Sequence, residues 1–144
     1  MIMRRMILIF AALLAFSLPA FSQTAVGAWN VTFSLESGDA QQLRFVAFSD
    51  HTGVFRFPTP SATAAPSAFP AVWARPNPTV LNFSGEVRME IPNCCTPSGT
   101  LVFKSGRTTA ARMTGFVVFV ADGQPPALAV HYGTFTAVPA VVTP

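Results

Sequence analysis

The stretch 79–91, T-V-L-N-F-S-G-E-V-R-M-E-I, alternates apolar and polar residues along almost its whole length. Side chains of a β-strand point alternately to opposite faces, so this pattern predicts a long strand with one buried and one solvent-facing side. The residues expected on the buried side are Leu81, Phe83, Val87, Met89 and Ile91, with Gly85 as the one gap. The rest of the chain should therefore fold to cover this apolar stripe.

Seven further segments have strand-like patterns and are separated by turn-forming residues. The clearest is 27–36, which places Trp29, Val31 and Phe33 on its inner side. The others are expected at 43–48, 54–57, 71–75, 100–104, 112–121 and 127–138. Residues 58–70 are expected to form a Pro- and Ala-rich loop, and residues 105–111 a connection.

About eight strands joined mostly by short turns predict an all-β fold, a single antiparallel up-and-down barrel that leaves no free edge. The alternative is a two-sheet β-sandwich, which the same pattern permits. An outer-membrane barrel would need an apolar outer band, whereas the expected outer side of the central strand carries Glu86, Arg88 and Glu90.

Residues 1–22 have the features of a signal peptide. Arg4 and Arg5 precede an apolar run, and the small residues Ala20 and Ser22 stand where a signal peptidase would read them. The apolar run is too short for an uncleaved anchor, because Pro19 ends it. We expect one barrel domain at 23–144, located in the periplasm or outside the cell, with no stable membrane insertion.

The charge balance gives no reason to expect a nucleic-acid partner. Without the signal peptide, seven basic residues face six acidic ones, and the basic residues are not clustered. Neither a Gly-rich phosphate loop, a G-x-S-x-G motif nor a zinc-protease motif occurs in the sequence. The sequence therefore predicts no metal site and favours a protein that is not an enzyme.

Short motifs along the chain resemble those of the calycin barrels, the lipocalins and avidins. Gly27-Ala28-Trp29 is similar to the G-x-W opening of these families. Later segments are similar to landmarks of small secreted bacterial lipocalin-like proteins: residues 48–53, Trp73, residues 113–115, residues 122–123 and residues 133–137. The resemblance implies that Trp29 packs across one closed end of the barrel, against a late arginine for which Arg112 is the candidate.

The first function hypothesis is a secreted, non-enzymatic barrel that binds a small apolar or amphipathic ligand in its cavity. The expected lining residues are Phe33, Phe45, Phe55, Phe83, Met89 and Phe103. An eight-stranded barrel can also be filled by its own side chains, so plain core packing is an equal alternative. Two further hypotheses are a structural or surface-interaction protein acting through loops 59–70 and 92–99, and a calycin-type isomerase or cyclase.

His131 is the one residue for which a cofactor role is considered. We expect no cofactor, with one alternative: some calycin-like barrels bind haem through a late histidine, and His131 could face the interior in that role. The opposite orientation would leave its ring in water. The sequence leaves the inward face of the second, third and last strands open.

Cys94 and Cys95 are neighbours in a chain that is expected to be exported. Adjacent Cα atoms lie about 3.8 Å apart, which is less than the roughly 4.4 Å that ordinary disulfides need. A vicinal disulfide, a free pair and bonds to another chain are therefore all open, and the Pro-rich segment around them slightly favours the vicinal disulfide.

Overall fold

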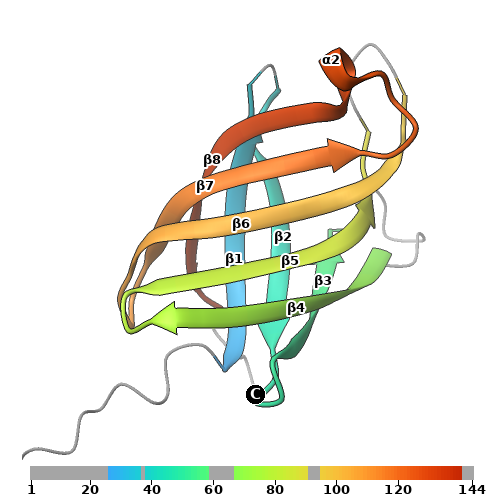
Figure 1. The fold of residues 1–144 in the computed structure, drawn as a ribbon. Coiled ribbons are helices and arrows are strands. Elements are labelled where there is room, and N and C mark those ends of the chain that lie inside the picture. The colour runs from blue at the N-terminus through green and yellow to red at the C-terminus, as the bar shows by residue number, and fades with distance from the viewer. Residues whose placement is uncertain (1–25, 37, 59–66, 91–94, 141–144) are drawn as a thin grey trace, which may run out of the picture.

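The computed structural model describes residues 26–36, 38–58, 67–90 and 95–140 of the 144-residue chain. Its eight strands pair in chain order, each antiparallel to the next, and the last strand pairs with the first. The result is a closed barrel (Figure 1), which confirms the predicted up-and-down barrel and excludes the sandwich. The predicted signal peptide, residues 1–22, lies outside the described residues and stays a prediction.

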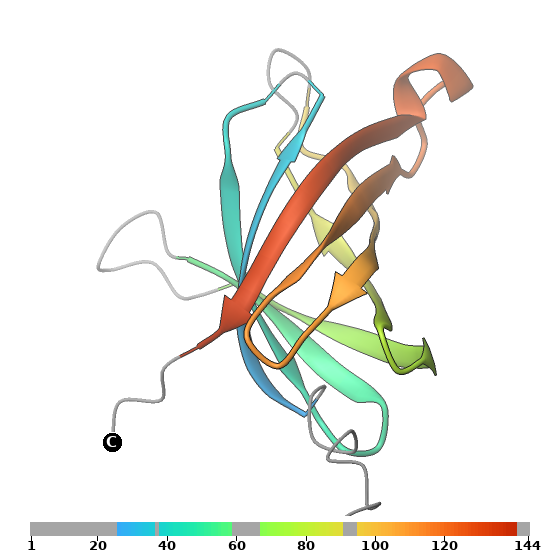
Figure 2. The same cartoon turned by 90° about the vertical axis from the view of Figure 1, so that its left-hand side faces the viewer.

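The strands run between two ends of the barrel. They are β1 Gly27–Leu35, β2 Gln41–Ala47, β3 Thr52–Phe57, β4 Ser67–Asn77, β5 Val80–Arg88, β6 Ser98–Thr108, β7 Met113–Ala121 and β8 Val130–Pro139. One turn of helix, α2 Pro126–Ala129, lies between β7 and β8. We call the end that carries α2 the α2 end, and the opposite end, where β1 begins and β8 finishes, the hairpin end (Figures 1 and 2).

Phenylalanine rings fill the middle of the barrel. Phe83 of β5 lies between Phe45 of β2 and Phe103 of β6, with ring centroids 4.5 and 4.6 Å apart and nearly parallel planes. Three more rings meet this stack edge-on, namely Phe33, Phe55 and Phe135. Since β2 and β5 are not neighbours in the sheet, the stack joins walls of the barrel that share no backbone hydrogen bonds. We refer to these six rings as the ring stack.

Three glycines give aromatic rings room on the inner face. A Cβ atom at Gly53 would lie 2.7 Å from Cε2 of Phe45, and one at Gly85 would lie 3.0 Å from Cε2 of Phe55. Gly99 has the same relation to Phe119, at 2.7 Å. Each ring thus covers a glycine, an arrangement that protects glycines in curved sheets. The gap that the sequence leaves at Gly85 is filled by Phe55.

Strand β4 begins earlier than predicted, because Pro70 does not stop it. A proline cannot donate to a strand ladder, so the sequence predicts a loop that extends to residue 70. In the structure β4 starts at Ser67 and pairs with β3, with Phe69 opposite Phe55. The pairing of β4 with β5 begins only at Ala71, so the missing N–H of Pro70 falls beyond the end of that ladder.

Strand β6 continues to Thr108, past the predicted end at residue 104. The polar run after Lys104 predicts a connection, but Ser105 and Thr108 are buried. The hydroxyl oxygen of Ser105 accepts hydrogen bonds from the backbone N–H of Leu81, at 2.6 Å, and from the hydroxyl of Thr108, at 2.8 Å. Buried hydroxyls with hydrogen-bond partners are tolerated, so the strand continues through a bulge between Ser105 and Arg107.

The predicted last strand, 127–138, is wrong at its beginning. Residues Pro126–Ala129 form α2, and β8 starts at Val130. Proline suits the first position of a helix, since its fixed φ matches the helix and no partner is needed there for an N–H group. The alternation of β8 places His131, Phe135 and Ala137 on the inner side and Tyr132 outside.

We expect Gly99→Ala to lower the free energy of unfolding by about 1–3 kcal/mol, the usual cost of overpacking. The added methyl group would collide with the carbonyl oxygen of Val120 and with the ring of Phe119. Urea unfolding measures the change. The control is Gly106→Ala, whose Cβ meets nothing within 4 Å and which should stay within about 0.5 kcal/mol of the wild type. Equal losses in the two variants would contradict the packing described.

Candidate functional site

The six residues predicted to line a cavity are all buried and lie inside the barrel. Five belong to the ring stack, and the sixth, Met89, follows β5 at the α2 end and is 4% exposed. A ligand cannot lie between Phe45, Phe83 and Phe103 without separating rings that are already in contact. The role of these residues as a cavity lining stays a prediction.

A layer of inward-facing residues closes the barrel at the α2 end, beyond the ring stack. Residues paired across neighbouring strands point to the same face of the sheet. Phe33 and Phe119 point inward, so their partners Gln41 and His131 point inward as well. Strand alternation adds the inward residues of the other strands. We call this set the mouth layer, and its members are Leu35, Gln41, Phe57, Phe69, Met89, Gly99, Phe119 and His131.

Most of the mouth layer is apolar. Leu35, Phe57 and Phe69 are half-buried and pack against the core, and the rings of Phe57 and Phe69 meet edge to face with centroids 5.8 Å apart. Phe119 is fully buried. The layer thus combines half-exposed apolar side chains with two polar ones, Gln41 and His131, which are also half-buried.

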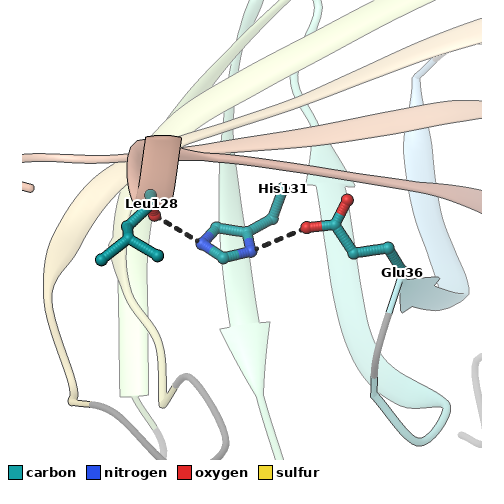
Figure 3. A network of polar contacts seen from close by, with 3 residues as sticks. All are labelled: Glu36, Leu128 and His131. Carbon is teal, nitrogen blue, oxygen red and sulfur yellow. Dashed lines mark hydrogen bonds and ion pairs between the residues drawn. The ribbon is translucent and has the colours of Figure 1, made fainter. Parts of the chain in front are cut away.

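His131 joins the connection before β8 to the end of β1 (Figure 3). Its Nε2 lies 3.0 Å from the carbonyl oxygen of Leu128 in α2, and its Nδ1 lies 3.1 Å from Oε1 of Glu36. A carbonyl oxygen and a carboxylate both accept, so both bonds form together only when both ring nitrogens carry a proton. The ring also stacks against Phe119, with centroids 6.4 Å apart.

This geometry bears on the haem hypothesis. His131 does lie on the inner face, as an axial ligand would have to, and its side chain is 16% exposed. A metal needs the lone pair of one ring nitrogen, and both nitrogens face acceptors here. Haem binding would therefore break the contact with Glu36 or with Leu128, and ligation by His131 stays a prediction.

The hairpin end holds the residues that the calycin resemblance singles out. Gly27 and Trp29 open β1, and Trp29 is 3% exposed. Arg112 is exposed in the turn between β6 and β7, where its backbone N–H bonds to the hydroxyl of Thr109. The structure thus buries the tryptophan of the resemblance and places the candidate arginine at the surface.

A second aromatic contact at the hairpin end escapes prediction from the sequence. The ring of His51, in the turn between β2 and β3, stacks on the indole of Trp73 with centroids 4.2 Å apart. The indole N–H of Trp73 donates to the carbonyl oxygen of Phe48, and its backbone N–H donates to that of His51. His51 has φ of 69°, a left-handed conformation that is uncommon outside glycine. The contact ties the β2–β3 turn to β4.

Cys95 is disulfide-bonded. Cys94, the only other cysteine of the chain, lies outside the described residues. A disulfide between these two neighbours therefore stays a prediction. Among the described residues, no group of three or more His, Cys, Asp or Glu side chains could hold a metal ion.

The closed barrel of eight antiparallel strands is compatible with a calycin-like fold. Compared with known proteins, the sequence matches no family model and no curated protein. Within the described ranges, no helix has the length and apolar character needed to cross a membrane. The fold places the protein in the class of closed eight-stranded up-and-down β-barrels.

We expect the turn between β2 and β3 to lose stability in acid because of Asp50. Its carboxylate accepts from the hydroxyl of Thr52, at 2.6 Å, and from the Thr52 N–H, at 3.0 Å, and these bonds lower the pKa of Asp50. A lowered pKa favours folding above the ordinary carboxyl pKa, and the contribution disappears as the pH falls through the lowered value. Asp50→Ala should thus be less stable than the wild type at about pH 6, and the gap should be smaller at about pH 2, well below the ordinary carboxyl pKa of about 4.

Urea unfolding of both proteins at the two pH values measures this gap. Asp122→Ala is the matched control, since the side chain of Asp122 makes no hydrogen bond within the described residues. A gap for Asp50→Ala that stayed the same in acid would contradict the role assigned to the carboxylate.

Proposed function

We propose that the protein is an exported, non-enzymatic barrel of the calycin type that binds a small amphipathic molecule in its mouth layer. The observation that supports this most is the composition of that layer. Leu35, Phe57 and Phe69 keep some apolar surface exposed on the α2 side of the ring stack. Ligand sites in proteins are mostly apolar, with a few polar groups that fix orientation, and the mouth layer has this character.

The polar residues of the layer indicate what part of the ligand they would bind. Gln41 can donate and accept, and the imidazole of His131 lies beside the carboxylate of Glu36. A ligand with a single polar head could exchange hydrogen bonds with these groups while its apolar part rests on the phenylalanines. The ring stack beneath limits how far such a molecule can enter, so we propose that it lies across the mouth and does not run down the barrel axis.

A second candidate function, surface interaction, is favoured by a patch on the outer face. Phe116 of β7 is 69% exposed and Tyr132 of β8 is 59% exposed, and Val118 lies opposite Tyr132 between them. Exposed apolar residues that are contiguous on a sheet often mark contact sites. On this alternative the filled interior is a scaffold and the protein acts through its outside.

Titration with a dansylated fatty acid tests the proposal. We expect one probe molecule to bind per barrel, and Phe69→Ser to weaken binding at least about tenfold, since about 1.4 kcal/mol of apolar contact is lost. The matched control is Phe116→Ser on the outer face, which should bind the probe as the wild type does.

The outcomes separate the two candidate functions. Probe binding that is lost in Phe116→Ser and kept in Phe69→Ser would contradict the mouth site and support the outer patch. Native mass spectrometry of the protein purified from its own host adds a test without a probe, because a retained ligand would appear as added mass. A saturating probe signal with no difference between the variants would also overturn the proposal.

A further inference from the structure

Two arginines lie side by side in a groove on the outside of the barrel. The groove has a volume of about 450 Å³ and runs over β1, β2 and β3. Arg44 of β2 is the direct cross-strand partner of Arg56 of β3, and on its other side Arg44 faces Asn30 of β1. All three side chains are exposed on the outer face, away from the inward-facing mouth layer, with which the groove shares the residue Phe57 at the end of β3.

Among the described residues, no ion pair balances the two positive charges. Like charges directly opposite each other in a sheet repel and lower stability. Neither guanidinium has an ion-pair or hydrogen-bond partner within the part of the chain that the structure describes. The residues that line the groove include none with a carboxylate. Its outward polar side chains besides the arginines are Asn30, Thr32 and Gln42, which can all donate hydrogen bonds.

We propose that this groove binds a phosphate group carried by a small molecule. A guanidinium presents a planar fork of donors that fits two oxygens, and two adjacent forks can hold three or more oxygens of one tetrahedral anion. A phosphate with about two negative charges neutralises both arginines, whereas a single carboxylate would leave one charge unbalanced. Asn30 and Gln42 lie on the same face and supply neutral donors to the remaining oxygens.

The far side of the groove indicates what the phosphate is attached to. Pro58 directly follows β3, two residues after Arg56, and is an exposed lining residue of the groove, so apolar surface adjoins the arginines. A phosphate on a compact apolar group could use both parts of the groove. We therefore expect phenyl phosphate to bind more tightly than inorganic phosphate, and inorganic phosphate to bind more tightly than acetate.

Calorimetric titration with inorganic phosphate and with phenyl phosphate tests the proposal. We expect Arg44→Gln and Arg56→Gln each to weaken phosphate binding at least tenfold. Arg107→Gln is the control, because Arg107 is also exposed but lies on β6, outside the groove. Arg44→Gln should bind the dansylated fatty acid as the wild type does, because the side chain of Arg44 faces away from the mouth layer, so this proposal and the proposed function can fail separately.

Thermal unfolding provides a readout that does not depend on measurable heat. In phosphate-free buffer, Arg44→Gln should melt above the wild type, since it removes the repulsion. Phosphate should raise the melting temperature of the wild type more than sodium chloride of equal ionic strength does, and should not do so for the variant. An equal effect of the two salts on the wild type, or equal weakening by Arg107→Gln, would overturn the proposal.

Discussion

The structure depends on aromatic rings that fit over glycines inside a closed sheet. A barrel of eight strands has an interior just wide enough for side chains, and here that space is taken by phenylalanines in mutual contact. A ring can pack directly against the backbone of the sheet only where the residue beneath it has no side chain, and Gly53, Gly85 and Gly99 provide these positions. Phe83 then bridges strands that are not neighbours, so the packing of the rings and the closure of the sheet support each other.

A filled interior determines where the protein can meet other molecules. The ring stack occupies the middle, so the available places are the mouth layer at the α2 end and the outer face. These places differ in chemistry. The mouth layer offers half-buried apolar side chains with His131 and Gln41, while the outside carries the paired arginines on β2 and β3 and the apolar patch on β7 and β8. The mouth layer suits an amphipathic molecule, and the paired arginines suit a phosphate group.

The sequence predicts the barrel because the alternation of apolar and polar residues, which marks each strand and its inner face, can be read within each short segment. The strand count, the inner faces of β1 and β5 and the burial of the six predicted interior residues follow from it. Features that depend on contacts between residues far apart in the sequence cannot be predicted in this way. Pro70 is compatible with β4 only because the β5 ladder starts one residue later, and Ser105 remains in a strand because Leu81 and Thr108 satisfy its hydroxyl. The inward side of β8, and with it the contacts of His131, depends on pairing with β7 that no local pattern shows.

Phe83 lies between two other rings in the interior, and no ligand space separates the three rings. Nuclear Overhauser effects between aromatic protons of the folded protein in water test this most directly. The account predicts strong effects from the ring of Phe83 to the rings of both Phe45 and Phe103, and none from water to the Phe83 ring. Missing contacts between these rings, together with water signals at Phe83, would show an open cavity and contradict it.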